Sequence, residues 1–168
     1  MDARRRRFEA LCVPLRADLY RFAVWLARDA SVAEDVVQET MLRAWKSLDA
    51  LAEDAAVKPW LLTIARREHA RLHERKRLET VDVDSLTAIE DPALGRSDDQ
   101  ETEDLRAAIL RLPDEYREPL VLQVLIGCST EEIASQLGLT SGAVLTRLCR
   151  ARQKLRTEVL GRAAEAAP

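Results

Sequence analysis

The sequence predicts an all-α fold, with two small helical domains joined by a flexible acidic linker. Apolar residues recur at intervals of three and four along most of the chain, which is the period of an amphipathic helix. Five Gly, six Pro and few runs of β-branched residues argue against a β-sheet. A length of 168 residues suits one domain or two small ones. Because the helical period fails between residues 79 and 100, we predict domains at 1–78 and 101–160.

Four helices are predicted in the first domain, at residues 3–13, 14–29, 31–48 and 58–78. Pro14 and Pro59 each suit the first turn of a helix, where a missing amide proton removes no helical hydrogen bond. Ser31 and Glu34 have the spacing of a capping box and open the third helix. Residues 49–57 lack periodicity and are predicted to form a loop.

The second domain begins with two predicted helices, one from Glu101 to the residue before Pro113 and one over residues 114–126. Their apolar residues at helical spacing are expected to face inward. In the first helix these residues are Leu105, Ala108, Ile109 and Leu112, and in the second they are Tyr116, Leu120, Val121, Val124 and Leu125.

The predicted linker and tail lack the apolar residues of a core. The linker, residues 79–100, is acidic and contains Pro92 and Gly95 as helix breakers. An anionic tether that lies in a basic channel and a solubilising spacer are both open interpretations of this segment. Residues 161–168 have too little apolar surface to bury and are predicted to be a disordered tail.

Residues 129–156 predict two short helices joined by a tight turn, which is a helix-turn-helix. Ser129 and Glu132 have the spacing of a capping box at the start of the first helix. Gly138 follows the last periodic residue of that helix, where Gly enters the left-handed conformation without steric cost.

The second helix of this motif begins at Thr140 or Ser141, either of which is able to cap it. Its inward positions are Val144, Leu148, Ala151 and Leu155. Its outer surface and edges carry Ser141, Leu145, Thr146, Arg147, Cys149, Arg150 and Arg152. A helix-turn-helix directs such residues to base edges and phosphates. The alternative is a helical hairpin of an ordinary bundle, with a solvated basic face.

The charge distribution indicates local basic surfaces in a chain with a net charge of −3 and a pI of about 5.6. Lys and Arg concentrate at 4–7, 66–77 and 147–156, whereas acidic residues concentrate at 79–103. The cationic half of the fourth helix includes Arg66, Arg67 and Arg71. This half is interpreted either as a solvated face or, beside a second DNA-binding element, as a set of phosphate contacts.

The sequence predicts no membrane span, metal site, cofactor or catalytic site. The stretch after the arginines at 4–7 is interrupted by charged residues and Pro14, so the chain is expected to be cytoplasmic. His69 and His73 are four residues apart, but two ligands do not make a metal site. The cysteines have no metal-ligand spacing and are expected to be reduced: Cys12, Cys128 and Cys149.

Four motifs in this order resemble the extracytoplasmic-function sigma factors of bacterial RNA polymerase. They are AEDVVQETMLRAWKSL at 33–48, PWLLTIARR at 59–67, LPDEYREPLVL at 112–122 and EEIASQLGLTSGAVLTRLCRARQKL at 131–155. The resemblance implies that the first domain is sigma region 2, which binds core polymerase and recognises and melts the minus-10 element. It implies that the second domain is region 4, which recognises the minus-35 element.

The resemblance also implies roles for individual residues. Those expected to grip the clamp helices of the beta-prime subunit are Asp35, Gln38, Glu39 and Arg43. The loop 49–57 is expected to capture a flipped minus-10 base, with Arg66, Arg67 and Arg71 on the DNA backbone. Region 4 is expected to sit on the beta flap and to place residues 141–152 in the major groove, with Thr146, Arg147, Cys149 and Arg150 nearest the DNA. An anti-sigma factor is an implied partner.

Three other functions are weighed against a sigma factor. A sigma-like decoy that binds an anti-sigma factor has no need of the cationic residues on both domains. A free-standing helix-turn-helix regulator usually needs a dimer interface for paired half-sites, and no leftover apolar helix supplies one. An enzyme that uses His69 and His73 lacks any further catalytic group in its pattern.

Overall fold

The computed structural model describes residues 2–79 and 100–166, so most of the predicted acidic linker, at 80–99, lies outside the described residues. Every regular element in the described ranges is a helix, which confirms the all-α prediction. The chain divides into two compact units. Residues 2–79 are the described part of the N-terminal unit, and residues 100–166 are that of the C-terminal unit.

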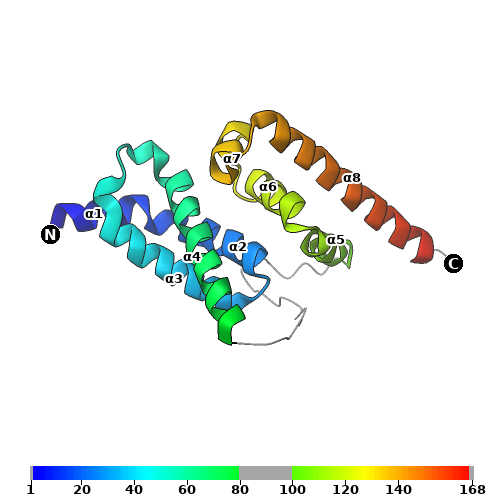
Figure 1. The fold of residues 1–168 in the computed structure, drawn as a ribbon, viewed down its shortest axis with the longest axis horizontal. Coiled ribbons are helices and arrows are strands. Elements are labelled where there is room, and N and C mark those ends of the chain that lie inside the picture. Colours follow the sequence, from blue (N-terminus) through cyan, green and yellow to red (C-terminus); the bar gives the residue numbers. More distant parts are fainter. Residues whose placement is uncertain (1, 80–99, 167–168) are drawn as a thin grey trace. The chain divides into compact units, whose positions relative to one another are not determined.

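The N-terminal unit is a small bundle in which α2, α3 and α4 pack against one another (Figure 1). Its helices are α1 (Asp2–Leu11), α2 (Arg16–Ala27), α3 (Ala30–Ser47) and α4 (Val57–Glu79), and its short 3-10 turns are η1 (Val13–Leu15), η2 (Leu48–Ala50) and η3 (Asp54–Ala56). The core is formed by large apolar side chains that are at most 2% exposed, among them Leu19, Phe22, Val36, Leu48 and Leu61. Their burial is the main stabilising contribution to the unit.

Helix α3 begins two residues earlier than a cap at Ser31 would allow. Asp29 is the N-cap, and its carboxylate accepts a hydrogen bond from the backbone N–H of Val32 at 2.9 Å. Arg28, with φ of 57°, ends α2 in the left-handed region. The predicted capping box of Ser31 and Glu34 is therefore wrong: the sharp end of α2 leaves Asp29 in extended backbone, and Ser31 falls inside the first turn of α3.

The segment predicted to be a loop at 49–57 does connect α3 to α4, and parts of it form the short 3-10 turns η2 and η3. Helix α4 begins at Val57, so Pro59 lies in its first turn as expected. The inner face of α4 includes Leu61, Leu62 and Ala65.

The C-terminal unit packs three shorter helices on one long helix (Figure 1). The elements are α5 (Gln100–Arg111), α6 (Asp114–Val124), α7 (Thr130–Leu137) and α8 (Ser141–Ala166). Side chains at most 1% exposed form its centre, among them Leu122, Ile133, Val144, Leu148 and Ala151. The predicted inward positions Val144, Leu148 and Ala151 of the second helix-turn-helix helix are confirmed.

Arg117 of α6 is a buried charged residue, only 3% exposed, and it connects α6 to the end of α5. Its guanidinium donates to the carbonyl oxygens of Leu110 and Leu112, at 3.2 and 3.3 Å, and forms an ion pair with Asp114. The last carbonyls of a helix have no intrahelical donor, so this arginine satisfies two acceptors at the end of α5.

Three expectations for this unit are wrong. Leu105 is 44% exposed and Val124 is 65% exposed. The face of α6 toward the core instead includes Leu122, and the N-terminal part of α5 presents Asp104, which lies 3.7 Å from Arg162 of α8. The tail predicted to be disordered from residue 161 is helical as far as Ala166, because α8 continues past the core.

Candidate polymerase and nucleic-acid interface

One face of α3 carries the side chains predicted to bind polymerase. Asp35, Gln38 and Glu39 are exposed, and their spacing of three and four residues places them on one side of the helix. Leu42 lies one turn further along the same side and is 52% exposed. The face therefore combines acidic and amide groups with one exposed apolar side chain.

Arg43, the fourth predicted polymerase-binding residue, is held by a buried carboxylate. Its Nε lies 2.7 Å from Oε1 of Glu68 on α4, and its side chain remains 49% exposed. Arg71 of α4 donates to the same carboxylate, at 3.2 and 3.3 Å. Glu68 itself is 7% exposed, so two arginines compensate one desolvated charge.

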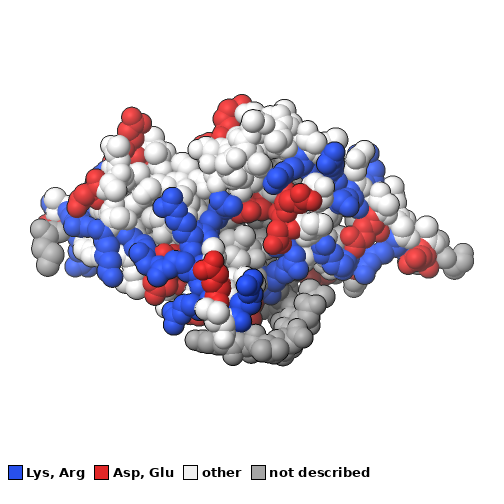
Figure 2. Space-filling model, viewed as in Figure 1, with Lys and Arg blue, Asp and Glu red and all other residues white. Residues whose placement is uncertain are grey.

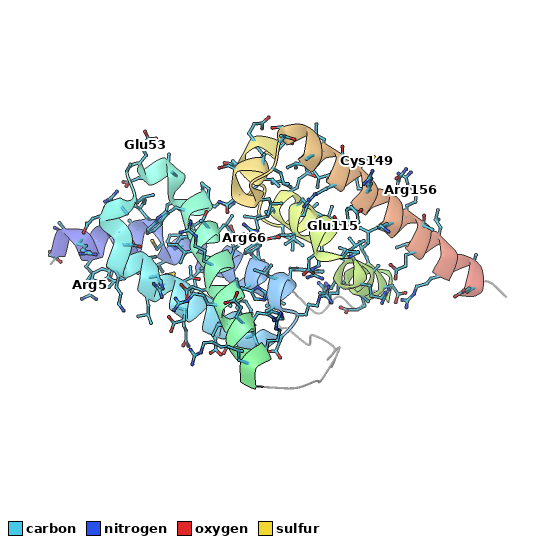
Figure 3. All side chains as sticks on the ribbon, viewed as in Figure 1. Arg5, Glu53, Arg66, Glu115, Cys149 and Arg156 are labelled. Carbon is cyan, nitrogen blue, oxygen red and sulfur yellow. The ribbon has the colours of Figure 1, made fainter. Side chains whose placement is uncertain are left out.

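The cations of α4 are not equivalent in their surroundings. Figure 2 shows Lys and Arg side chains grouped over α1 and α4 of the N-terminal unit. Arg67 is exposed, whereas Arg66 is half-buried near the middle of α4 (Figure 3). Arg71 is 58% exposed and tied to Glu68. The three arginines predicted to contact the DNA backbone thus share one helix and differ in how firmly they are held.

The helix-turn-helix has the local geometry that its sequence predicts. The Ser129 Oγ accepts from the Glu132 backbone N–H at 3.1 Å, and the Glu132 carboxylate accepts from the Ser129 backbone N–H at 2.7 Å. Gly138 has φ of 64° and ends α7. Thr140 is the cap of α8, because its hydroxyl accepts from the Ala143 backbone N–H at 3.1 Å. A reciprocal capping box therefore begins α7, a left-handed Gly ends it, and a single hydroxyl cap begins α8.

The predicted DNA-binding side of α8 is open to solvent. The exposed predicted residues are Ser141, Leu145, Thr146, Cys149, Arg150 and Arg152, and Arg147 is half-buried. Cys149 and Arg156 lie on the outer side of α8 (Figure 3). All seven predicted residues belong to α8.

The cations of α8 fall into two groups. Arg152 donates to Oε1 of Gln123 on α6, and the ammonium of Lys154 lies 5.6 Å from the ring centroid of Tyr116. In the described part of the chain, no ion pair holds Arg147 or Arg150. Arg147 and Arg150 are thus available for phosphate or base contacts, whereas Arg152 and Lys154 are braced against α6.

Titratable and metal-ligating groups form no further site within the described ranges. No group of three or more His, Cys, Asp and Glu side chains is placed to hold a metal among them. The rings of His69 and His73 stack with centroids 6.1 Å apart. Cys12 is buried, and burial raises the pKa of its thiol. Among the described helices, none is long and apolar enough to cross a membrane.

Four side chains at or beside these surfaces were not predicted: Leu42 of α3, Glu68 of α4, and Arg4 and Arg7 of α1, which form ion pairs with Asp49 and Asp54 of the loop. Leu42 has a sequence signal, because it is spaced three residues from Glu39 and lies off the apolar stripe of α3. Glu68 interrupts the apolar face of α4, which is a sequence signal, but the neighbouring residues in the sequence do not indicate that it pairs with Arg43 of α3. The arginines of α1 have only the signal of opposite charge in the loop 49–57.

Comparison with known proteins matches both units to one family. Residues 13–79 match "Sigma-70 region 2", and residues 102–155 match "Sigma-70, region 4". The ECF RNA polymerase sigma factor EcfG of Rhodopseudomonas palustris is 36% identical over 140 residues, which are 82% of this chain and 76% of the relative. The probable RNA polymerase sigma factor RfaY of Xanthomonas campestris is 36% identical over 148 residues, 83% of this chain but 37% of the longer relative.

A solved structure agrees with these relatives. The sigma factor RpoE of Bartonella quintana, crystallised in complex with the anti-sigma factor NepR, is similar with a TM-score of 0.76 and 30% identity. The match covers 92% of this chain and 96% of that one. Sigma factors are transcription initiation factors without enzymatic activity. Both sigma regions match in order, and EcfG is matched over 76% of its length at 36% identity, so the chain belongs to the extracytoplasmic-function RNA polymerase sigma factors of the sigma-70 family.

Proposed function

We propose that this sigma factor directs core RNA polymerase to promoters through two separate surfaces, one on each unit. The observation that carries the proposal is the outer side of α8, where Arg147 and Arg150 lie on the second helix of a helix-turn-helix without a partner among the described side chains. A helix-turn-helix places this part of its second helix in the major groove. Region 4 therefore reads the minus-35 element, with Ser141, Leu145 and Thr146 near the bases.

The N-terminal unit binds polymerase and opens the minus-10 element. The exposed face of Asp35, Gln38 and Glu39 grips the clamp helices of the beta-prime subunit, with Arg43 at its edge. The loop 49–57 captures one flipped base, and the α4 arginines hold the DNA backbone. Extraction of a base from its stack costs a few kcal/mol, so a pocket with phosphate anchors beside it supplies what strand opening needs.

An anti-sigma factor controls this activity by covering the polymerase-binding and DNA-binding surfaces. The support is that the similar RpoE of Bartonella quintana was crystallised with the anti-sigma factor NepR. Region 4 also contacts the beta flap of polymerase. The protein works in the cytoplasm, where core polymerase and promoter DNA are found.

Run-off transcription tests the function directly. Core polymerase from a bacterium is incubated with a genomic fragment library, with and without this protein, and the new transcript starts are sequenced. New starts that share two spaced boxes support the proposal and deliver the promoter. If the protein binds core and no new start appears, promoter recognition as proposed is wrong; if it does not bind core, a decoy that only titrates an anti-sigma factor explains the fold better.

A further inference from the structure

Helix α1 lies outside both family matches, which cover residues 13–79 and 102–155. Two of its arginines, Arg4 and Arg7, nevertheless contact the end of α3 and the segment between α3 and α4. The guanidinium of Arg4 donates to the carbonyl oxygens of Trp45 and Lys46, at 2.6 and 3.1 Å. These carbonyls belong to the last turn of α3, where no intrahelical donor reaches them. Arg4 therefore caps the end of α3 from another helix.

Arg4 has two further contacts at the same place. Its Nη1 lies 3.3 Å from a carboxylate oxygen of Asp49, and its guanidinium lies 5.3 Å from the ring centroid of Trp45. Phe8 of α1 meets the same Trp45 ring edge-on, with centroids 5.3 Å apart. Aromatic and cation–π contacts of this kind add to the fixing of α1 on α3.

Arg7 spans the second half of the segment. Its Nη2 donates to the carbonyl oxygen of Leu51 at 2.9 Å and to Oδ1 of Asp54 at 2.8 Å, and its Nε donates to the same Oδ1 at 3.0 Å. Leu51 is also buried, at 4% exposed. Arg7 therefore holds the chain at Leu51 and at Asp54, on either side of residues 52–53. A planar guanidinium is suited to such a forked contact, and an ammonium is not.

The two other arginines of α1 have no such role. Arg5 pairs with Glu9 and Arg6 with Asp2, each on its own helix, and their side chains are 72% and 71% exposed. Arg5 points away from the rest of the N-terminal unit (Figure 3). The run of four arginines thus contains two that hold the loop and two that face solvent, which provides a matched internal control.

The contacts change both the position and the charge of the loop. Asp49 and Asp54 would repel DNA phosphates, but each is paired with an arginine of α1. Glu53, at the outer tip of the loop, has no ion pair in the described residues (Figure 3). The segment 48–56 has only two single 3-10 turns of its own, so side chains from outside must fix its path.

We propose that Arg4 and Arg7 are positioning residues that hold the segment 48–56 in the conformation that captures the flipped minus-10 base, and that they mask its acidic charge from DNA. This inference rests on the proposed function of the N-terminal unit. It assigns a role in promoter opening to a helix outside the sequence shared with region 2. Arg4 and Arg7 act through the loop and touch no base themselves.

The test uses the full chain assembled with core polymerase and the promoter obtained from run-off transcription. Affinity is measured for single-stranded minus-10 oligonucleotides, either intact or with an abasic site at each position in turn. If the parent protein captures one base in a pocket, removal of that base should weaken its binding about tenfold or more. The discrimination ratio is the affinity for the intact oligonucleotide divided by the affinity for the oligonucleotide that lacks this base. With Arg4→Ala and Arg7→Ala together, this discrimination ratio falls to near one while the affinity for core is retained.

The control replaces Arg5→Ala and Arg6→Ala, which removes the same charge from α1 and leaves the ratio unchanged. Arg7→Lys keeps the charge but not the fork, so it lowers the ratio several-fold in a folded protein. It serves as the informative variant if the double alanine protein does not fold. The proposal is overturned if the folded Arg7→Lys or double alanine protein discriminates like the parent, or if the Arg5 and Arg6 control loses discrimination equally. A parent protein that fails to bind core, by contrast, refutes the proposed function itself.

Discussion

Nε of Arg43, on α3, lies 2.7 Å from Oε1 of Glu68, on α4, and the carboxylate is only 7% exposed. The same carboxylate accepts from Arg71. One buried acid therefore joins Arg43, at the edge of the proposed polymerase-binding face, to Arg71 on the helix proposed to bind DNA. The pairing couples the orientations of α3 and α4. If either arginine moves away, the buried Glu68 carboxylate loses one of its two cationic partners, which is unfavourable.

Removal of Arg43 should cost more stability than removal of an unpaired arginine. Arg43→Ala leaves Glu68 with one cation, which we expect to lower the free energy of unfolding by roughly 1 to 3 kcal/mol. Arg67→Ala, which removes an exposed arginine of α4, should change it by less than about 0.5 kcal/mol. Urea unfolding followed by circular dichroism measures both. Equal midpoints for the two variants would show that the ion pair adds nothing.

Glu39→Arg should weaken binding to core polymerase and leave the fold intact. Glu39 is exposed beyond the first turn of α3, so its charge is not needed for capping. A reversed charge at a complementary interface should cost about tenfold or more in affinity. Glu34→Arg, which reverses a charge on the same helix at a residue that is not predicted to bind polymerase, is the control and should bind more tightly than Glu39→Arg. Unchanged binding with unchanged helicity removes Glu39 from the interface.

Arg150→Ala should weaken recognition of the minus-35 element by roughly 1 to 3 kcal/mol. Arg150 is exposed in the first half of α8, where the groove is expected. Arg156→Ala removes a cation further along the same helix and should have the smaller effect. The measurement is binding and transcription on the promoter with an intact or a scrambled minus-35 box. If the loss is the same on both boxes, Arg150 contacts no base there.

Two glycines at the helix-turn-helix should respond to alanine in opposite directions. Gly138 has φ of 64°, so Gly138→Ala forces a Cβ into the left-handed region and should destabilise the C-terminal unit by about 1 kcal/mol. Gly142 lies inside α8, and a Cβ added there would meet no atom within 4 Å, so Gly142→Ala should stabilise by roughly 0.5 to 1 kcal/mol. Thermal unfolding of both variants checks the signs. A stabilising Gly138→Ala would contradict the left-handed cap.

The three cysteines should differ in reactivity. Cys149 is exposed, whereas Cys12 and Cys128 are buried, and burial raises the pKa of the Cys12 thiol. At mildly alkaline pH, iodoacetamide should therefore modify Cys149 first, with Cys12 and Cys128 modified only after denaturation. Mass spectrometry of a time course gives the order. Early modification of Cys12 in the folded protein would contradict the packing of the N-terminal unit.

The sequence by itself determined what depends on near neighbours in the chain. Helical periodicity, the capping box at Ser129 and the left-handed turn at Gly138 involve residues at most four positions apart, so their pattern predicts their geometry. The exposed face of α3 and the cationic faces of α4 and α8 followed from the same period. Four motifs in order also identified the family.

Only the tertiary structure decided which side chains meet across the fold. The pairing of Arg43 with Glu68 and the reach of Arg4 to Trp45, 41 positions away, depend on how helices pack. Packing also left Val124 exposed, and α8 continues into the predicted tail as far as Ala166. The physical reason is that a salt bridge or buried contact is set by distance in space, and many sequence-distant partners of the right charge compete for each residue.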